Sequence, residues 1–161
     1  MHLKTQTLYG IIALLLAFAL IISGLAALYY YQYNQAESAN QTYVQQLKQL
    51  NVKYYSNILI DYGNGTKTWY NETKVDPGWN LYVTTQIITN GHVNATYYPQ
   101  YGSHFITAIY NVPDTKSKYW LLWTWNATAS WQTAQVGSDQ LKMYNGSVYA
   151  WAYCSAGCAA P

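Results

Sequence analysis

Few side chains in this chain of 161 residues could do acid–base, nucleophilic or metal chemistry. Beyond the apolar start of the chain there are two histidines, His92 and His104, and six carboxylates, at positions 37, 61, 72, 76, 114 and 139. No two carboxylates form a recognisable pair, and the sequence has no phosphate loop, nucleophile elbow or HExxH motif. His92 and His104 could share a metal with a carboxylate, but such residues more often lie at exposed strand ends. We therefore expect no enzymatic activity, no catalytic residue, no cofactor and no metal site.

Two cysteines, Cys154 and Cys158, lie in the terminal segment 154–161. A copper motif or a haem attachment site would need a following histidine, which this segment lacks. Outside the cytoplasm the default for such a pair is a disulfide. We expect that bond here, either within one chain or between two chains.

The composition is poor in charge and rich in aromatic rings. Charged residues make up 9% of the chain, with a net charge of +2 and no arginine, so the basic patch of a nucleic-acid binder is absent. Aromatic residues make up 17%, which argues against disorder. Rings left exposed near turns would suit stacking on sugars or contact with another subunit. The candidates for this contact surface are Trp69, Trp79, Trp131, Tyr97, Tyr98 and Tyr101.

Residues 8–28 form an uncharged apolar run, flanked by tyrosines at both ends. As a helix the run would be about 31 Å long, which matches the hydrocarbon core of a bilayer. Lys4 and the terminal amine precede it and no lysine follows until Lys48, so the positive-inside rule predicts an extracytoplasmic remainder. We expect a cytoplasmic tail at 1–7 and a single-pass anchor at 8–29. Cleavage as a signal peptide is the alternative.

The part predicted to lie outside carries six Asn-X-Ser/Thr sequons, where chance gives about two for this composition. We expect a glycoprotein of the cell surface. The low charge leaves little stability that acid can remove, and the composition resembles that of secreted proteins of thermoacidophilic archaea. The predicted acceptors are Asn40, Asn64, Asn71, Asn94, Asn126 and Asn145.

The elements that must position these residues follow from hydrophobic periodicity. Residues 30–52 predict a polar helical stalk, and residues 53–153 predict an α+β domain with one sheet and one crossing helix. That helix is expected over 79–90, capped by Asp76 with Pro77 in its first turn and stopped by Gly91. Strands are expected from Lys53 to Asp61 and at 66–74, 92–97, 105–110, 119–126, 131–136 and 147–153. The strand at 119–126 is apolar on both faces, which predicts a covered position inside the sheet.

Several segments resemble one known family. They are Asp61–Gly65, the Pro77-Gly78 pair, Phe105–Ile109, Tyr119–Asn126, Val136–Asp139 and Asn145–Trp151. Together they are similar to the C-terminal domain of the vitamin B12 carriers transcobalamin and intrinsic factor, a domain that recurs alone in prokaryotic surface proteins. The resemblance covers about 60% of the chain, from Ile58 to Tyr153, and implies a β-grasp-like fold. The large helical domain of the carriers is missing here, so cobalamin binding does not carry over.

Three functions are compatible with this sequence. The first is a membrane-anchored extracytoplasmic module that binds a surface ligand or a protein partner. A second copy of the chain is one candidate for that partner. The second is a structural subunit of an archaeal surface filament, because an apolar helix leading into a β-rich head resembles a pilin. The third is an accessory subunit of a membrane complex. The first is the preferred interpretation.

Overall fold

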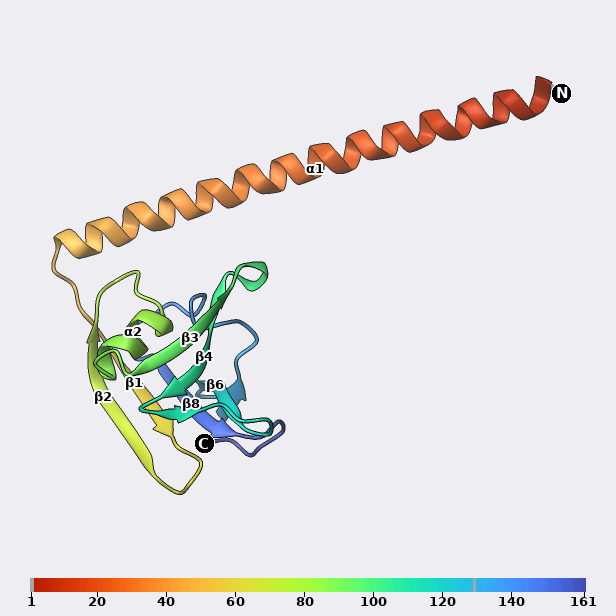
Figure 1. Cartoon of the computed structure of the whole chain (residues 1–161). Coiled ribbons are helices and arrows are strands. Elements are labelled where there is room, and N and C mark those ends of the chain that lie inside the picture. The colour runs from red at the N-terminus through yellow and green to blue at the C-terminus, as the bar shows by residue number, and fades with distance from the viewer. Residues whose placement is uncertain (1, 129) are drawn as a thin grey trace. The chain divides into compact units, whose positions relative to one another are not determined.

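The computed structural model describes residues 2–128 and 130–161, and the side chains of these residues except 2–8 and 13. Met1, in the predicted cytoplasmic tail, and Ala129 lie outside the described residues. The chain divides into two compact units, residues 1–45 and 46–161, which are shown in Figure 1. We call the second unit the head.

The first unit is dominated by α1 (His2–Gln49), a single uninterrupted helix of 48 residues. Its apolar half is rich in leucine, isoleucine and alanine and contains no proline. By length and composition α1 could cross a membrane, although a signal sequence near an N-terminus would pass the same test. The predicted anchor and stalk are thus continuous parts of one helix.

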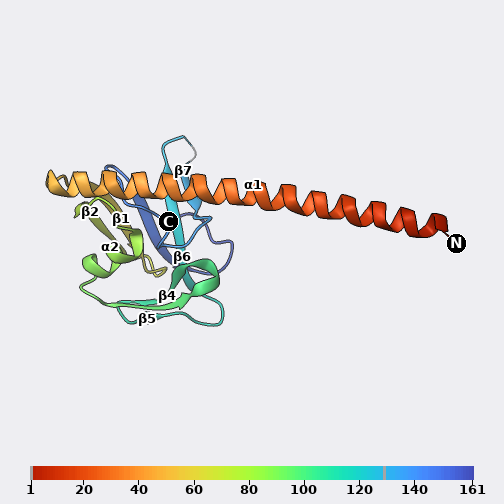
Figure 2. The same ribbon diagram turned by 90° about the horizontal axis from the view of Figure 1, so that it is seen from above.

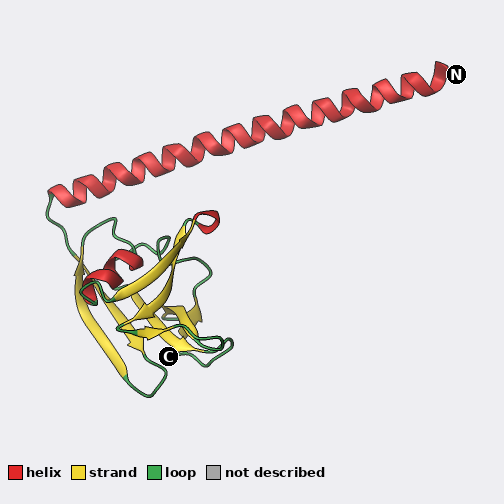
Figure 3. Cartoon of the chain, viewed as in Figure 1, coloured by secondary structure: helices red, strands yellow, loops and turns green. Residues whose placement is uncertain are grey.

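The head contains a five-stranded sheet in the order β2-β1-β8-β6-β7. The strands β1 and β8 pair in parallel, whereas all other neighbours in the sheet are antiparallel. Figure 3 shows that strands and loops make up most of the head. The bounds are β1 (Tyr54–Asp61), β2 (Lys67–Val75), β6 (Tyr119–Asn126), β7 (Ser130–Thr133) and β8 (Val148–Cys154).

A smaller antiparallel sheet has the order β3-β4-β5, with bounds β3 (Val93–Tyr98), β4 (Ser103–Ile109) and β5 (Val112–Pro113). A short 3-10 turn, η1 (Pro99–Tyr101), joins β3 to β4. The one α-helix described in the head is α2 (Leu81–Ile88). Figures 1 and 2 show α2 and the small sheet on the same side of β1, β8 and β6.

The main core fills the space between these layers. Ile58 and Ile60 of β1 and Trp151 of β8 meet Leu81 of α2 and Ile109 of β4, and all five are buried. Trp151 also donates its indole N–H to the Thr85 hydroxyl of α2 at 2.9 Å. The crossing helix is therefore held to the sheet by apolar packing and by a buried hydrogen bond.

The opposite face of the five-stranded sheet carries a second, smaller core. Leu59 and Trp123 are buried there with two alanines of β8, because side chains alternate between the two faces of a strand. Cys154 and Cys158 are joined by a disulfide within the chain and pack against this cluster. The disulfide predicted from the sequence is thus present, and it places the terminal segment over one part of this face.

The predicted α+β class with a preceding apolar helix is confirmed, and β6 lies inside the sheet as expected. The strands form two sheets, however, where one was expected. The helix also begins later than predicted: Asn80 is its N-cap and accepts a hydrogen bond from the Val83 backbone N–H at 2.9 Å. Asp76 instead lies in a preceding turn, where its carboxylate pairs with Lys53. The helix ends at Ile88, and Gly91 closes its C-terminal turn with a bond to the Gln86 carbonyl.

Candidate functional site

A pocket of about 510 Å³ lies beside β4, between this strand, β6 and the segment 133–140. We call it the β4 pocket. Apolar side chains form much of its wall, including Trp120, Leu122 and Trp151, and polar groups come from His104 and Gln140. Its volume falls in the range typical of small-molecule sites, about 300–1,000 Å³.

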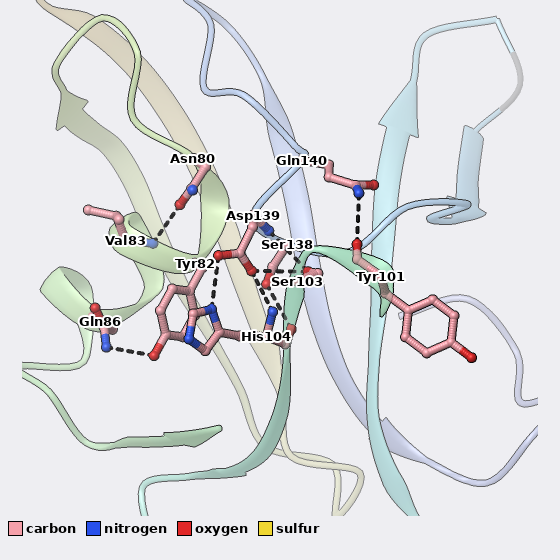
Figure 4. Close-up of polar contacts among 10 residues, drawn as sticks. All are labelled: Asn80, Tyr82, Val83, Gln86, Tyr101, Ser103, His104, Ser138, Asp139 and Gln140. Carbon is pink, nitrogen blue, oxygen red and sulfur yellow. Dashed lines mark hydrogen bonds and ion pairs between the residues drawn. The ribbon is translucent and has the colours of Figure 1, made fainter. Parts of the chain in front are cut away.

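The carboxylate of Asp139 holds one wall of the pocket together. It accepts hydrogen bonds from the His104 backbone N–H at 2.6 Å and from the Ser103 hydroxyl at 3.0 Å, while its second oxygen lies 2.9 Å from Nδ1 of His104 (Figure 4). The Ser138 hydroxyl also donates to the His104 carbonyl. The segment 133–140 is thereby attached to the start of β4, although the two are more than 30 residues apart in sequence.

The hydrogen bonds to Asp139 also determine its charge state. Partial burial acts to raise the pKa of this carboxyl group, but the bonds from His104 and Ser103 stabilise the ionised form more strongly. The pKa of Asp139 is therefore below its ordinary value. Asp139 is an anion at neutral pH and can serve as a permanent acceptor for its three donors.

The imidazole ring of His104 lies between two tyrosines. It stacks on Tyr82 of α2 with ring centroids 3.9 Å apart and planes 6° from parallel, and Tyr97 contacts it at 4.9 Å. Burial, followed by the nearby Asp139 charge, raises the pKa of Tyr82, so its hydroxyl stays protonated. Figure 4 shows the Tyr82 ring over the imidazole, with Gln86 at the phenol oxygen. One face of the His104 ring is thus covered by Tyr82, and Tyr97 contacts the ring at an inclined angle.

Although serine, histidine and aspartate meet here, their geometry differs from that of a catalytic triad. In a triad the histidine bonds the serine nucleophile, and the aspartate bonds the far side of the histidine. Here the Ser103 hydroxyl donates to Asp139, and Ser103 is completely buried. Gly137 packs directly on Ser103, because a Cβ atom at residue 137 would overlap the serine side chain. These residues fix the wall of a pocket.

The structure separates the residues predicted as a contact surface into different surroundings. Tyr97, Tyr98 and Tyr101 are exposed at the end of the β3–β4 hairpin, and Tyr98 and Tyr101 lie together with Phe105. Trp69 is exposed on β2. Trp131 is half-buried against the second core, and Trp79 is half-buried against the main core.

All six predicted acceptor asparagines are exposed. Asn40 lies on α1, Asn71 on β2 and Asn94 on β3, while Asn64, Asn126 and Asn145 lie at turns or strand ends. His92 stacks on Tyr110, far in sequence from the Asp139 cluster. In the described part of the chain, no three His, Cys, Asp or Glu side chains come together as a metal site would require.

Two features of the site escape sequence reasoning. The sequence analysis favours an exposed strand end for His104 and gives Asp139 no site role of its own, and no short-range spacing links the two residues. The segment Val136–Asp139 was singled out only for its resemblance to a family, yet it supplies the carboxylate that organises the pocket. Trp125, which lies 5.3 Å from Trp131 by ring centroid, is a further exposed ring that was not predicted.

Neither protein-family models nor curated proteins match this sequence. Among solved structures, haptocorrin in complex with Cbi is similar to this chain with a TM-score of 0.52 and 14% sequence identity. The match covers 65% of this chain and 25% of the haptocorrin chain, so this chain corresponds to about a quarter of that protein. At this identity the likeness concerns the fold, and it supports a distant fold relationship to the family that the sequence resembles.

A second similar structure is that of a protein from Ruminococcus gnavus ATCC 29149 whose description proposes metal binding. Its TM-score is 0.48 at 14% identity, and the match covers 63% of this chain and 97% of that chain.

Proposed function

We propose that this chain is a membrane-anchored, extracytoplasmic binding module without enzymatic activity, and that the β4 pocket takes its ligand. The pocket carries this proposal, because it combines a volume suited to a small molecule with rigid walls. Asp139 fixes one wall, and Trp120 and Trp151 of the main core form part of the other. The likeness of the fold to part of haptocorrin, which is described in complex with Cbi, supports a binding role.

The lining indicates the chemistry of the ligand. Tryptophan and leucine side chains offer apolar contact area, while Gln100, Gln140 and Ser138 offer hydrogen bonds without a formal charge. His104 is already bonded to Asp139 and stacked on Tyr82. The ligand we expect is a compact, mostly apolar molecule with a few uncharged polar groups.

The pocket can be tested by filling it. Ala134 lines the pocket, and its backbone N–H donates to the carbonyl of Leu122, another lining residue. Thr133 pairs with Trp123, so its side chain lies on the opposite face of the sheet. We would purify full-length Ala134→Trp, Thr133→Trp and unchanged protein from native membranes and identify bound small molecules by native mass spectrometry. The unchanged protein and Thr133→Trp should carry the same molecule, and Ala134→Trp should lack it. A bound molecule in all three proteins, or in none, would contradict the assignment of the pocket.

The membrane topology needs a separate test. Protease added outside intact cells should remove the head and leave a membrane-bound stub. Protection of the head until the cells are lysed would contradict the proposed orientation. A mature N-terminus between Leu25 and Tyr29 would show that the apolar segment is a cleaved signal peptide.

One observation favours a second function, a structural subunit of a surface filament. Helix α1 has 48 residues, about 72 Å of helix, whereas a bilayer core needs about 30 Å. Its described apolar side chains are exposed, so several such helices could pack together. Electron microscopy of the native cell surface tests this alternative, since filaments that contain the chain would support it over the binding module.

A further inference from the structure

A second hollow, distinct from the β4 pocket, lies on the face of the five-stranded sheet opposite α2. Its volume is about 520 Å³, and its walls are Trp69, Trp125 and Trp131, with Asn57, Asn71 and Val148 completing the lining. We call it the tryptophan hollow. The binding role proposed for the β4 pocket does not use it.

The hollow lies between side chains that come from the two edges of the sheet. Strands β2 and β7 are its two edges, and in a flat five-stranded sheet they would lie about 19 Å apart. Yet Trp69 of β2 and Trp131 of β7 approach each other with ring centroids 6.4 Å apart. Trp125 then meets Trp131 edge to face at 5.3 Å. The three indoles thus form a continuous concave wall.

The lining suits a carbohydrate better than an ionic ligand. All six lining residues are uncharged, and Trp69 and Trp125 remain 46% and 45% exposed. One face of a sugar ring presents C–H groups that pack on the electron-rich face of an indole, while its hydroxyl groups need hydrogen-bond partners at the rim. Asn57 accepts a bond from the Glu72 backbone N–H through its oxygen, so its NH₂ group is available to donate.

The chain places a sugar acceptor inside this hollow. Asn71 begins the sequon Asn71-Glu72-Thr73, its side chain is exposed, and it lines the same hollow as Trp69. Two residues along a strand lie on one face about 6.6 Å apart, which lets a sugar on Asn71 reach the Trp69 ring. None of the other five acceptors shares a described pocket with exposed tryptophans in this way.

We propose that the glycan attached to Asn71 folds back into the tryptophan hollow, with its first sugar ring stacked on Trp69. This inference rests on the extracytoplasmic location in the proposed function. In the attachment, the side-chain nitrogen of Asn71 bonds to the anomeric carbon of a phosphate-activated sugar. The phosphate leaves with the bonding electrons and the nitrogen loses one proton. The sugar then covers the exposed indole surface of the head.

The test uses full-length protein from its native membrane, with glycan occupancy mapped by mass spectrometry. Nuclear Overhauser contacts should connect the first sugar on Asn71 to the Trp69 indole, and the sugar C–H resonances should shift upfield. Asn71→Gln and Thr73→Ala both abolish the sequon and should lower the Tm of the head. Thr73→Ser, which preserves the sequon, and Asn94→Gln, which removes a glycan elsewhere, should leave the Tm near that of the unchanged protein.

A double substitution separates sugar packing from other effects of these changes. In a Trp69→Ala background, whose fold is checked by circular dichroism, removal of the Asn71 sequon should no longer lower the Tm. An occupied Asn71 whose glycan makes no contact with the indoles would overturn the inference. So would an unoccupied Asn71 in protein glycosylated at Asn94 or Asn126, a result that leaves the proposed location intact.

Three further outcomes also overturn the inference. Binding of an added oligosaccharide in the hollow, with the Asn71 glycan free, would assign the hollow to an external saccharide. Dimers lost in Trp69→Ala would assign it to a second copy of the chain. Absence of glycan at every sequon would overturn both this inference and the prediction that the surface is glycosylated. The membrane orientation would still be tested separately by the protease experiment.

Discussion

Two buried tryptophans on neighbouring strands allow the value of one indole hydrogen bond to be measured. Trp151 of β8 is 3% exposed, and its N–H donates to Thr85. Trp123 of β6 is 7% exposed on the opposite face, and its N–H has no partner among the described residues. Replacement by phenylalanine deletes the same atoms at both positions. The transfer and cavity costs therefore enter both variants and largely cancel in the comparison.

The polar contributions do not cancel. Trp151→Phe loses a hydrogen bond with a net value of about 0.5–1.5 kcal/mol, whereas Trp123→Phe removes an unpaired buried donor that costs about 1–3 kcal/mol. Trp151→Phe should therefore lose about 1.5–4.5 kcal/mol more free energy of unfolding than Trp123→Phe. Chemical denaturation of the full chain in mild detergent, followed by near-ultraviolet circular dichroism, measures this difference.

The role of Thr85 provides the control for this comparison. Thr85→Val removes the acceptor of the Trp151 bond, so it should cost less in the Trp151→Phe background than in the unchanged protein. The Thr85 hydroxyl also donates to the Leu81 carbonyl, and loss of that bond enters both backgrounds equally. Equal losses for the two tryptophan variants, or additive costs in the double variant, would refute this account of the core.

Three further predictions concern the head. Asp139→Asn should destabilise the head at neutral pH. Because the pKa of Asp139 is lowered in the folded state, the difference in stability between the variant and the unchanged protein should shrink as the pH falls below about 3.8. Urea midpoints measured across that pH range would show no such trend if Asp139 were unimportant. Gly137→Ala should cost about 1–3 kcal/mol, because the new methyl group meets the buried Ser103 side chain, and a Tm equal to that of the unchanged protein would contradict this packing. Replacing Cys154 and Cys158 by serine should cost at most about 2 kcal/mol in thermal unfolding, because the bond closes a very short ring, and unfolding of the head would show a larger role.

Local signals in the sequence were sufficient for most elements of the fold. The apolar residues on both faces of 119–126 predicted β6 with its bounds and its covered position, because both sides of that strand pack on apolar neighbours. The start of α2 was harder to predict, since Asp76-Pro77-Gly78 and Asn80 are both acceptable starts. The choice depended on contacts that are remote in sequence, such as the bond from the Leu81 backbone N–H to the Leu141 carbonyl.

The two sites were harder to predict than the elements of the fold, because both are formed by contacts between residues that are distant in sequence. The bonds that Ser103 and His104 donate to Asp139 join residues about 35 positions apart, and no periodic pattern in the sequence predicts such a contact. The tryptophan hollow depends on Trp69 of β2 and Trp131 of β7, whose rings meet although their strands are the two edges of the sheet and lie far apart in sequence. Trp69 and Trp131 were recognisable as candidate contact rings, but their meeting across the sheet was not.

The parallel pairing of β1 with β8 also determines the order in which the head can assemble. Strand β1 and its antiparallel neighbour β2 are synthesised early, but the parallel partner β8 begins only at Val148, so this pair closes across almost the whole length of the head. Contacts this remote in sequence form slowly. A chain that is still emerging from the ribosome lacks Trp151, and with it the bond to α2 and part of the main core. We therefore expect the five-stranded sheet to close only once β8 is available, and chains that stop short of β8 to be less resistant to proteolysis than the full chain.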